Sequence, residues 1–326
     1  MLSRRNLLVT AATALALCAG MSNLALAQDD YPTRPIKIVI ANPPGGDDDT
    51  LTRFIAPTLS AELGQPVVVE NRGGGASTLG AMAASQANPD GYTLLCLHTA
   101  GLVQTQLRSN LSYSLDSFEP IALIGGYPMA LVVSAASNID SVPNLKKVAN
   151  TADGVTFASA GAGTLGHLTA VRFLKAIEGN GVHVAYKNNP DGLQALSGGF
   201  TQMMFPSARE GANLQKDGLL RVLAVTSPQR TVNLPDVPTM TELGYPSIDS
   251  QLWYSYAAPA GTPPEILEKL TSAITKAVET KEFKERFGPM AYQSDVRTGA
   301  ELKKFWKSEA DRWRQVIVEN NVRFTD

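Results

Sequence analysis

The sequence predicts an α/β protein of two domains, and three observations carry the prediction. Strand-like and helix-like runs alternate almost throughout the chain, which is the pattern of parallel α/β sheets. The chain has 326 residues, enough for two domains of ordinary size. Two stretches rich in Gly or Pro, 124–128 and 227–253, are suited to connect them. We therefore expect domain 1 over 28–128 plus 250–326 and domain 2 over 129–249, with loops of both facing a shared cleft.

Residues 1–27 have the features of an export signal. Two arginines precede an apolar run over 7–17, and Ala25-Leu26-Ala27 is a small-x-small cleavage site. The segment Ser3-Arg4-Arg5-Asn6-Leu7-Leu8 also matches a twin-arginine signal, so the export route stays open. The apolar run is short for a membrane span. We expect a cleaved leader and a mature protein that is exported but not inserted in a membrane.

The strands follow in order along the mature chain. Ile36-Lys37-Ile38-Val39-Ile40 predicts the first strand, and a loop with two prolines and two glycines leads from it into a helix. A Gly/Ala-rich loop and a helix near 76–87 separate the next two strands. The further strands, each followed by a helix or a turn signal, are predicted over 66–70, 92–96, 155–158, 183–186, 202–205 and 220–226.

The helices have their own start signals. Asp49 and Asp191 are expected N-caps. Glu265 lies in the first turn after two prolines, at the start of a helix that runs to about residue 280. In the last helix, near 299–320, apolar and aromatic side chains recur at helical spacing, which indicates core packing.

Composition narrows the classes of function. With 44% hydrophobic and 18% charged residues, the chain is typical of a soluble globular protein. A formal net charge of −2 argues against a nucleic-acid partner, so any anion site must be made locally. Of the two cysteines, Cys18 lies in the leader and Cys96 in a predicted strand, which leaves no internal disulfide in the mature chain.

Three strand-to-helix loops could hold such an anion. In the first, proline rigidity precedes glycines whose backbone amides can approach a ligand closely. The second offers two hydroxyls and several amides at a helix start. The third supplies a hydroxyl and a guanidinium, which suits a carboxylate. The candidate residues are Pro44, Gly45 and Gly46 in the first loop, Ser159, Ala160, Gly161 and Thr164 in the second, and Ser207 and Arg209 in the third.

Signals for catalysis are poor. The loop Gly161-Ala162-Gly163-Thr164-Leu165-Gly166 matches the G-x-G-x-x-G dinucleotide fingerprint, but Lys187 and Asn188 stand where the partner acid belongs. An exported NAD(P)-dependent oxidoreductase therefore stays as an alternative. The chain lacks a G-x-S-x-G elbow and metal-ligand spacing of its histidines. The acidic run 47–49 suits a helix start better than a metal. We expect a binding protein, not an enzyme, without metal or cofactor.

A set of motifs along the mature chain resembles a known family, the Bug-type (TctC-like) receptors. These are the extracytoplasmic solute-binding proteins of tripartite tricarboxylate transporters. The motifs are Tyr31-Pro32-Thr33-Arg34-Pro35-Ile36, Pro43-Pro44-Gly45-Gly46, Leu63-Gly64-Gln65-Pro66, Pro89-Asp90-Gly91-Tyr92, Ser159-Ala160-Gly161, Val184-Ala185-Tyr186-Lys187, Leu234-Pro235-Asp236-Val237-Pro238-Thr239 and Ala258-Pro259-Ala260-Gly261.

The resemblance implies a two-domain periplasmic binding protein of the Venus-flytrap type, similar to type II, that closes on a small carboxylate. The first two candidate loops then inherit the role of holding one ligand carboxylate through amides and hydroxyls. The implied partners are this ligand and a two-subunit inner-membrane permease, and the receptor is expected to be a monomer in the periplasm. A sensing receptor that feeds a signalling partner would share the same site and stays open.

Departures from the family pattern bear on the ligand. Asp47 and Asp48 stand where the family usually has Gly-Thr, and His98 lies where it often has Gly-Ser-Ser. Ser207 falls in place of a usual Asp-Asn pair, with Arg209 shortly after. The missing acid removes an acceptor for an ammonium, and His98 and Arg209 add donors. We therefore expect a dicarboxylate, with an aromatic acid of the phthalate type as one option.

Overall fold

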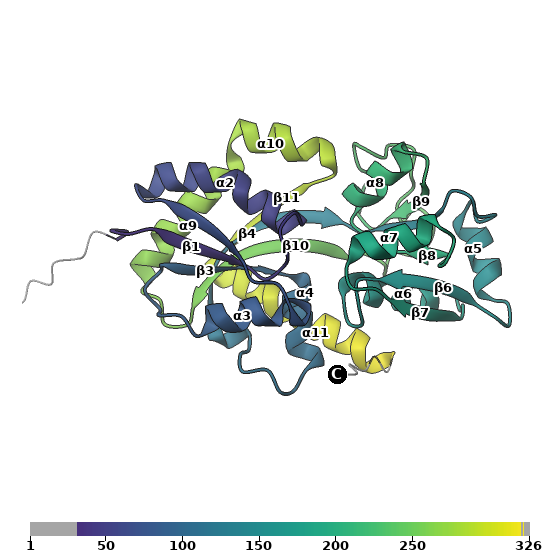
Figure 1. The fold of residues 1–326 in the computed structure, drawn as a ribbon, viewed down its shortest axis with the longest axis horizontal. Helices are drawn as coiled ribbons and strands as arrows, with labels where there is room; N and C mark the ends of the chain where they lie inside the picture. Colours follow the sequence, from purple (N-terminus) through teal and green to yellow (C-terminus); the bar gives the residue numbers. More distant parts are fainter. Residues whose placement is uncertain (1–30, 321, 323–326) are drawn as a thin grey trace, which may run out of the picture.

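The computed structural model describes residues 31–320 and 322, which form two lobes around two β-sheets (Figure 1). The first sheet contains β1 (Ile36–Ile40), β2 (Val67–Asn71), β3 (Thr93–His98), β4 (Phe118–Pro128), β10 (Gln251–Pro259) and β11 (Gln293–Thr298). The second contains β5 (Ala130–Ser134), β6 (Val155–Ser159), β7 (Gly181–Ala185), β8 (Met203–Met204) and β9 (Leu220–Val225). The prediction of a two-domain α/β fold is confirmed.

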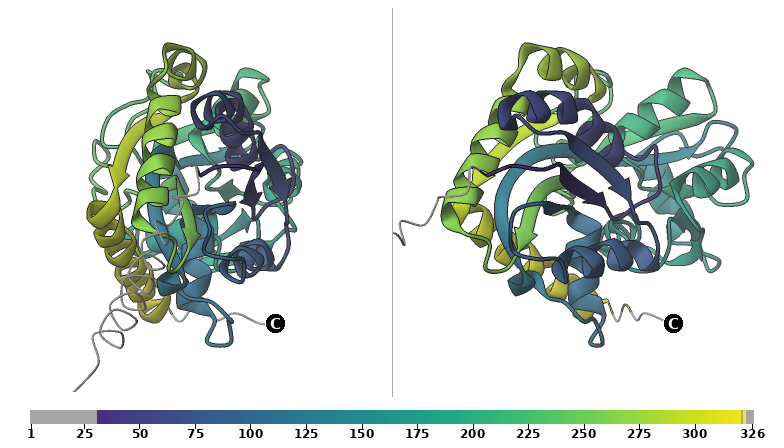
Figure 2. Two further views of the ribbon diagram at one scale, coloured as in Figure 1. Left: turned by 90° about the vertical axis from the view of Figure 1, so that its left-hand side faces the viewer. Right: turned by 60° about the vertical axis from the view of Figure 1, so that its left-hand side comes forward.

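Helices cover both faces of each sheet (Figures 1 and 2). Those of the first lobe are α2 (Asp47–Leu63), α3 (Thr78–Ser85), α4 (Thr99–Leu107), α9 (Pro264–Glu279), α10 (Lys281–Phe287) and α11 (Gly299–Glu319), with the 3-10 turns η1 (Gly75–Ser77), η2 (Leu115–Ser117) and η3 (Gly288–Met290). Those of the second are α5 (Val142–Ala149), α6 (Leu165–Ala176), α7 (Asn189–Ser197) and α8 (Ala208–Lys216).

Alternation along the strands explains this layering. In β1, Ile36, Ile38 and Ile40 pack with α2, α9 and α10, whereas Val39 faces the cluster that includes α3, α4 and α11. Successive side chains of a strand point to opposite faces, so a strand with buried apolar side chains on both faces belongs in a sheet covered on both sides. The second sheet repeats the arrangement, because Leu131 and Val133 join the cluster of α5 and α6 while Val132 packs with α7 and α8.

Both sheets are mixed rather than wholly parallel. The first has the order β11-β4-β10-β3-β1-β2, in which β1 runs parallel to β2 and β3 and β10 runs antiparallel to β3 and β4. The second has the order β7-β6-β8-β5-β9, in which β6 is parallel to β7 and β8 and β5 is antiparallel to β8 and β9. The strands predicted from the sequence are present, and β4, β5, β10 and β11 are additions.

The chain passes from one sheet to the other twice. β4 ends at Pro128 and β5 begins at Ala130, and the chain returns between β9 and β10. The stretch 124–128, which the sequence suggested as a connection, is the end of β4 and pairs with β10. Two glycines permit close pairing on either side of β4. A Cβ on Gly126 would lie 2.0 Å from the carbonyl oxygen of Leu252 in β10, and one on Gly125 (φ +112°) 2.1 Å from that of Gln293 in β11.

Within the described part of the chain, every helix falls short of the length and apolar character that crossing a membrane requires.

Candidate functional site

The predicted ligand loops lie at the carboxyl ends of strands in both sheets. The first loop follows β1, whose neighbour β3 ends at His98, and the other two follow the adjacent parallel strands β6 and β8. Carboxyl ends of parallel strands meet at one edge of a sheet, where α/β proteins usually bind ligands. The structure therefore gathers the candidate residues into one group on each lobe.

The loop after β1 is held together by Asp49. Gly46 is the N-cap of α2 and Asp49 lies in the first turn, so the expectation of Asp49 as N-cap is wrong. Its Oδ2 accepts a hydrogen bond from the Gly45 amide (3.0 Å), and its Oδ1 accepts from Arg53 Nε (2.9 Å) and Asn71 Nδ2 (3.0 Å). Burial raises the pKa of Asp49, but these donors outweigh it and hold the pKa below its usual range. The Gly45 amide is therefore already occupied.

His98 is enclosed behind this loop. Its side chain is 4% exposed, and Nε2 lies 3.0 Å from Asn42 Nδ2 and 4.0 Å from Asp48 Oδ2. Asn42 Nδ2 also donates to Asp48 Oδ2 (2.7 Å). Burial lowers the pKa of His98 and the Asp48 carboxylate opposes that shift. The geometry makes His98 a partner of the loop's own side chains, and its role toward a ligand stays a prediction.

The loop after β6 satisfies most of its own polar groups. Ser159 Oγ accepts from the Gly161 amide (3.1 Å) and lies 2.7 Å from His183 Nε2, and Thr164 Oγ1 donates to the Gly161 carbonyl (2.8 Å). Gly161 has φ +119°, a conformation that L side chains rarely adopt. Among the described residues, the amides of Ala160 and Ala162 have no acceptor. These amides are the donors that this loop can still offer.

Two stacked imidazoles support the same loop. The ring centroids of His167 and His183 lie 4.0 Å apart, and Phe157 stacks on both. His167 Nδ1 accepts a hydrogen bond from the Gly163 amide (2.9 Å). Burial, and secondarily the neighbouring His183, lower the pKa of His167 to about 4. His167 is therefore uncharged near neutral pH and acts as an acceptor that shapes the loop.

The loop after β8 ends in a capping box at the start of α8. Ser207 Oγ accepts from the Glu210 amide (3.3 Å) and donates to Glu210 Oε2 (3.0 Å), so this hydroxyl serves the helix start. Arg209 projects from the first turn of α8, with its guanidinium carbon 6.0 Å from the ring centroid of Tyr127. Burial lowers the pKa of Arg209, but Asp47 and Glu210 outweigh it and raise the pKa above its ordinary value.

Two contacts join the two groups of loops across the lobes. Arg209 forms an ion pair with Asp47, which lies in the first turn of α2 on the opposite lobe. On α4, Leu107 packs so closely on Gly163 that an added Cβ there would lie 2.1 Å from Leu107 Cδ1. Gln104, also on α4, has a buried Nε2 without an acceptor among the described residues. Asp47 and Gln104 were not among the predicted site residues.

A cavity of about 500 Å³ lies beside the ion pair. Its walls come from α8, the loop after β9 and η3, and thus from both lobes. Arg209 and Lys216 give it two cationic side chains, and Asn233 Oδ1 and Arg209 Nε have no hydrogen-bond partner within the described structure. The volume falls in the range typical of small-ligand pockets. The Arg209 guanidinium is therefore accessible from this cavity as well as paired with Asp47.

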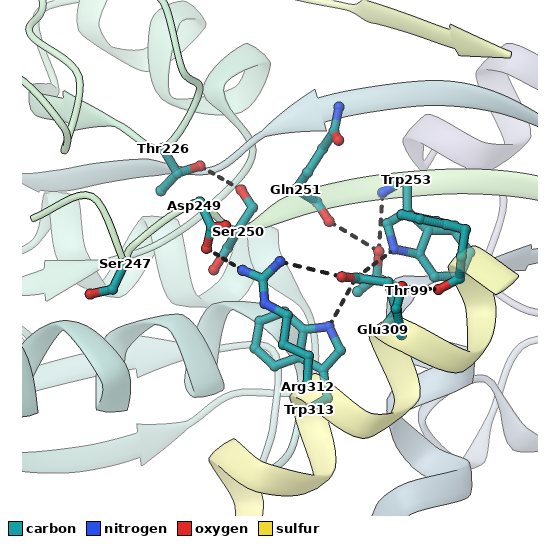
Figure 3. A network of polar contacts seen from close by, with 12 residues as sticks. Thr99, Thr226, Ser247, Asp249, Ser250, Gln251, Trp253, Glu309, Arg312 and Trp313 are labelled. Carbon is teal, nitrogen blue, oxygen red and sulfur yellow. Dashed lines mark hydrogen bonds and ion pairs between the residues drawn. The ribbon is translucent and has the colours of Figure 1, made fainter. Parts of the chain in front are cut away.

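Polar contacts hold the two crossing segments together, and Figure 3 shows those of the returning segment, among them the bond between Thr226 and Ser250. The Met129 amide donates to Thr226 Oγ1 (2.8 Å), the Thr226 amide donates to the Met129 carbonyl (2.9 Å), and Thr226 Oγ1 donates to the Ser250 carbonyl. Thr99 Oγ1 accepts from the Trp253 amide (3.0 Å). Both segments are thus fixed to each other where they pass between the lobes.

The helix α11 adds charged contacts at the same place (Figure 3). Glu309 Oε2 accepts from the indole Nε1 of Trp253 (2.9 Å) and of Trp313 (3.1 Å), and Oε1 accepts from Arg312 Nη1 (3.3 Å). Asp249, in the returning segment, forms ion pairs with Arg312 of α11 and, at 3.3 Å, with Arg172 of α6. The network therefore connects the first lobe, the crossing segment and the second lobe.

The chain matches a family model described as the tripartite tricarboxylate transporter family receptor, over residues 51–322. It is 32% identical over 299 residues to the protein BugT of Bordetella pertussis, with 90% of this chain and 92% of that protein covered.

Two solved structures show the same fold. MatC from Rhodopseudomonas palustris, with bound malate, is 26% identical at a TM-score of 0.79, covering 88% of this chain and 100% of the other. A second R. palustris protein, with adipate, is 25% identical at a TM-score of 0.82, covering 90% and 99%. Both ligands are dicarboxylates.

Proposed function

This chain belongs to the receptor family of the tripartite tricarboxylate transporters, and on that premise we propose that it captures a small dicarboxylate in the periplasm for uptake. The family is one of solute receptors, not of enzymes, which excludes the oxidoreductase alternative. The observation that carries the choice of a dicarboxylate is Arg209, a half-buried cation at the junction of the two groups of loops. The malate and adipate held by two relatives agree with it.

One ligand carboxylate is assigned to the backbone. The first amides of α2, at Asp47 and Asp48, lie at a helix N-terminus, where the helix supplies no acceptor for them and the dipole favours an anion. The amides of Ala160 and Ala162, which have no acceptor among the described residues, supply donors from the other lobe. Pro44 and Gly46 shape the first wall, and Ser159, Gly161 and Thr164 hold the second in place. A carboxylate between these walls would make contact with both lobes.

The second carboxylate is assigned to Arg209. A guanidinium presents its donors in a planar fork that matches a carboxylate, and such a bond contributes about 1.5–3 kcal/mol. Arg209 also lines the cavity of about 500 Å³, through which its guanidinium can be reached. The buried ring of Tyr127 lies below the guanidinium and would pack against an apolar or aromatic spacer.

Binding is proposed to close the two lobes on the ligand. The domains are taken as residues 28–128 plus 250–326, and 129–249. The hinge is placed at Met129, Thr226 and Ser250, whose hydrogen bonds join the crossing segments. A ligand that contacts both lobes favours the closed population. The closed monomer would then deliver the ligand to a two-subunit permease.

Calorimetry with matched variants tests the site. Malate, adipate and phthalate are titrated into the mature protein, with acetate, benzoate and amino acids as comparison ligands. Arg209→Ala should weaken the best dicarboxylate by at least about tenfold and leave monocarboxylates unchanged. Arg230→Ala is the control, because Arg230 forms an exposed ion pair with Glu242 on the same lobe. Equal affinity of wild type and Arg209→Ala, or binding of amino acids alone, would contradict the proposal.

A further inference from the structure

We propose that Asp47 is a built-in competitor of the ligand: a dicarboxylate reaching Arg209 displaces the Asp47 carboxylate, which then takes up a proton, so that capture consumes one proton. This inference rests on the proposed function, since it requires a ligand carboxylate at Arg209. It adds a residue that sets both selectivity and pH response.

Asp47 and a ligand carboxylate would compete for the same guanidinium. Asp47 and Arg209 come from different lobes and form a direct ion pair. Their side chains are 6% and 25% exposed, so neither is surrounded by water that would replace the partner. Arg209 Nε is buried without an acceptor among the described residues. A ligand carboxylate that takes the guanidinium in a bidentate manner would satisfy this donor and exclude Asp47.

The surroundings of Asp47 decide what happens to its charge. Glu210 on α8 and the neighbouring Asp48 are acidic, and the phenols of Tyr127 on β4 and Tyr254 on β10 face the same region. His98 on β3 lies 4.0 Å from Asp48, and burial favours its uncharged form. The charge of Arg286 on α10 lowers the pKa of Tyr127, against the effect of burial. Among these groups, Arg209 is the cation that stabilises the Asp47 carboxylate.

In the free protein, the pKa of Asp47 is already close to neutral pH. Burial raises the pKa of Asp47 to about 7, Glu210 and Asp48 act in the same direction, and Arg209 opposes them. When Arg209 turns to a ligand carboxylate, Asp47 loses its counterion and gains an anionic neighbour, and both changes raise its pKa further. The proton comes from solvent, and the bound site then holds a neutral Asp47, a cationic Arg209 and the ligand's dianion.

The sign of the pH dependence follows by linkage. Below about pH 7, Asp47 is largely protonated before binding and affinity is nearly flat. Above about pH 7, the free protein must gain a proton to bind, so affinity for the dicarboxylate falls by up to about tenfold per pH unit until the raised pKa is reached. A monocarboxylate that does not reach Arg209 leaves the ion pair intact and shows no such slope.

Calorimetry at pH 8 in phosphate and in Tris measures the proton directly, because these buffers differ in ionisation enthalpy. The probe is adipate or malate, whichever binds wild type, with acetate as comparison. Wild type should take up close to one proton with the dicarboxylate and none with acetate. Asp47→Asn should take up none and lose the pH slope between pH 7 and 9. Asp191→Asn, also in a helix first turn, is the control and should match wild type.

Each outcome is decisive. Dicarboxylate binding that depends on Arg209 but takes up no proton in wild type would overturn this inference and leave the proposed function standing. Absence of dicarboxylate binding would overturn the proposed function itself. The wild-type buffer series requires no variant, so a folding defect in Asp47→Asn would leave the test intact.

Discussion

Replacing Glu309 with alanine removes the acceptor shared by three side chains at the junction of the lobes. Its carboxylate binds the indole nitrogens of Trp253 and Trp313 and the guanidinium of Arg312. Both indoles are buried, at 2% and 0% exposure, so the variant leaves two donors without water or an acceptor. A hydrogen bond to a charged group contributes about 1.5–3 kcal/mol, and the two indoles together predict a loss of about 3–6 kcal/mol.

This magnitude converts into a measurable melting shift. Unfolding entropy is about 2.1 cal/mol/K per residue, which gives about 0.7 kcal/mol/K for 326 residues, so Tm should fall by about 4–9 °C. Differential scanning calorimetry provides the measurement. Glu319→Ala is the control on the same helix, because Glu319 forms an exposed ion pair with Lys175 and should change Tm by under about 1 °C.

Equal small shifts for Glu309→Ala and Glu319→Ala would refute the reasoning. Glu309→Gln keeps an acceptor oxygen of similar size and should fall between wild type and the alanine variant. A Gln variant as unstable as the alanine variant would mean that charge, not acceptance of the indole protons, dominates the network.

Two further predictions test other parts of the structure. Burial lowers the pKa of His167 to about 4, so the unfolded chain binds more protons than the folded protein between about pH 4 and 6.5. The free energy of unfolding, measured in urea, should therefore fall on the order of 2–3 kcal/mol as the pH drops through that window. The fall should be smaller in His167→Gln. A wild-type stability that is flat over this range would contradict it. Gly126→Ala should lower Tm by several degrees, because its Cβ would meet the Leu252 carbonyl at 2.0 Å, whereas Gly288→Ala, with nothing within 4 Å, should leave Tm unchanged or slightly higher. Similar Tm values for these two variants would show that β4 can move away from β10 at little cost.

Local pattern was sufficient for many of the elements. β1 begins and ends as predicted, and the last predicted helix, near 299–320, is present as α11. The family resemblance, based on motifs spread along the chain, is confirmed by the family model. β4 could not be predicted, because its two prolines and two glycines are weak strand formers, and pairing with β10 and β11 on either side stabilises it.

At the site, too, the sequence predicted the loops but not all of the contacts between their side chains. The sequence pointed to Arg209 and to the loops after β1 and β6, and it noted Asp47 as a departure from the family pattern. It placed the N-cap of α2 at Asp49, whereas Gly46 is the N-cap and Asp49 holds Gly45, Arg53 and Asn71. The partners of Asp49 lie before and after it in the chain, and local capping preferences do not contain that information.

The sequence by itself determined the order of most strands and helices, the α/β class with two domains and the receptor family, because periodicity, turn residues and motifs are local properties. Only the tertiary structure decided that Asp47 of one lobe neutralises Arg209 of the other, and that Glu309 joins α11 to β10. These pairings depend on which side chains lose water together when distant segments pack. That desolvation, which also raises the pKa of Asp47, arises only when the chain is folded.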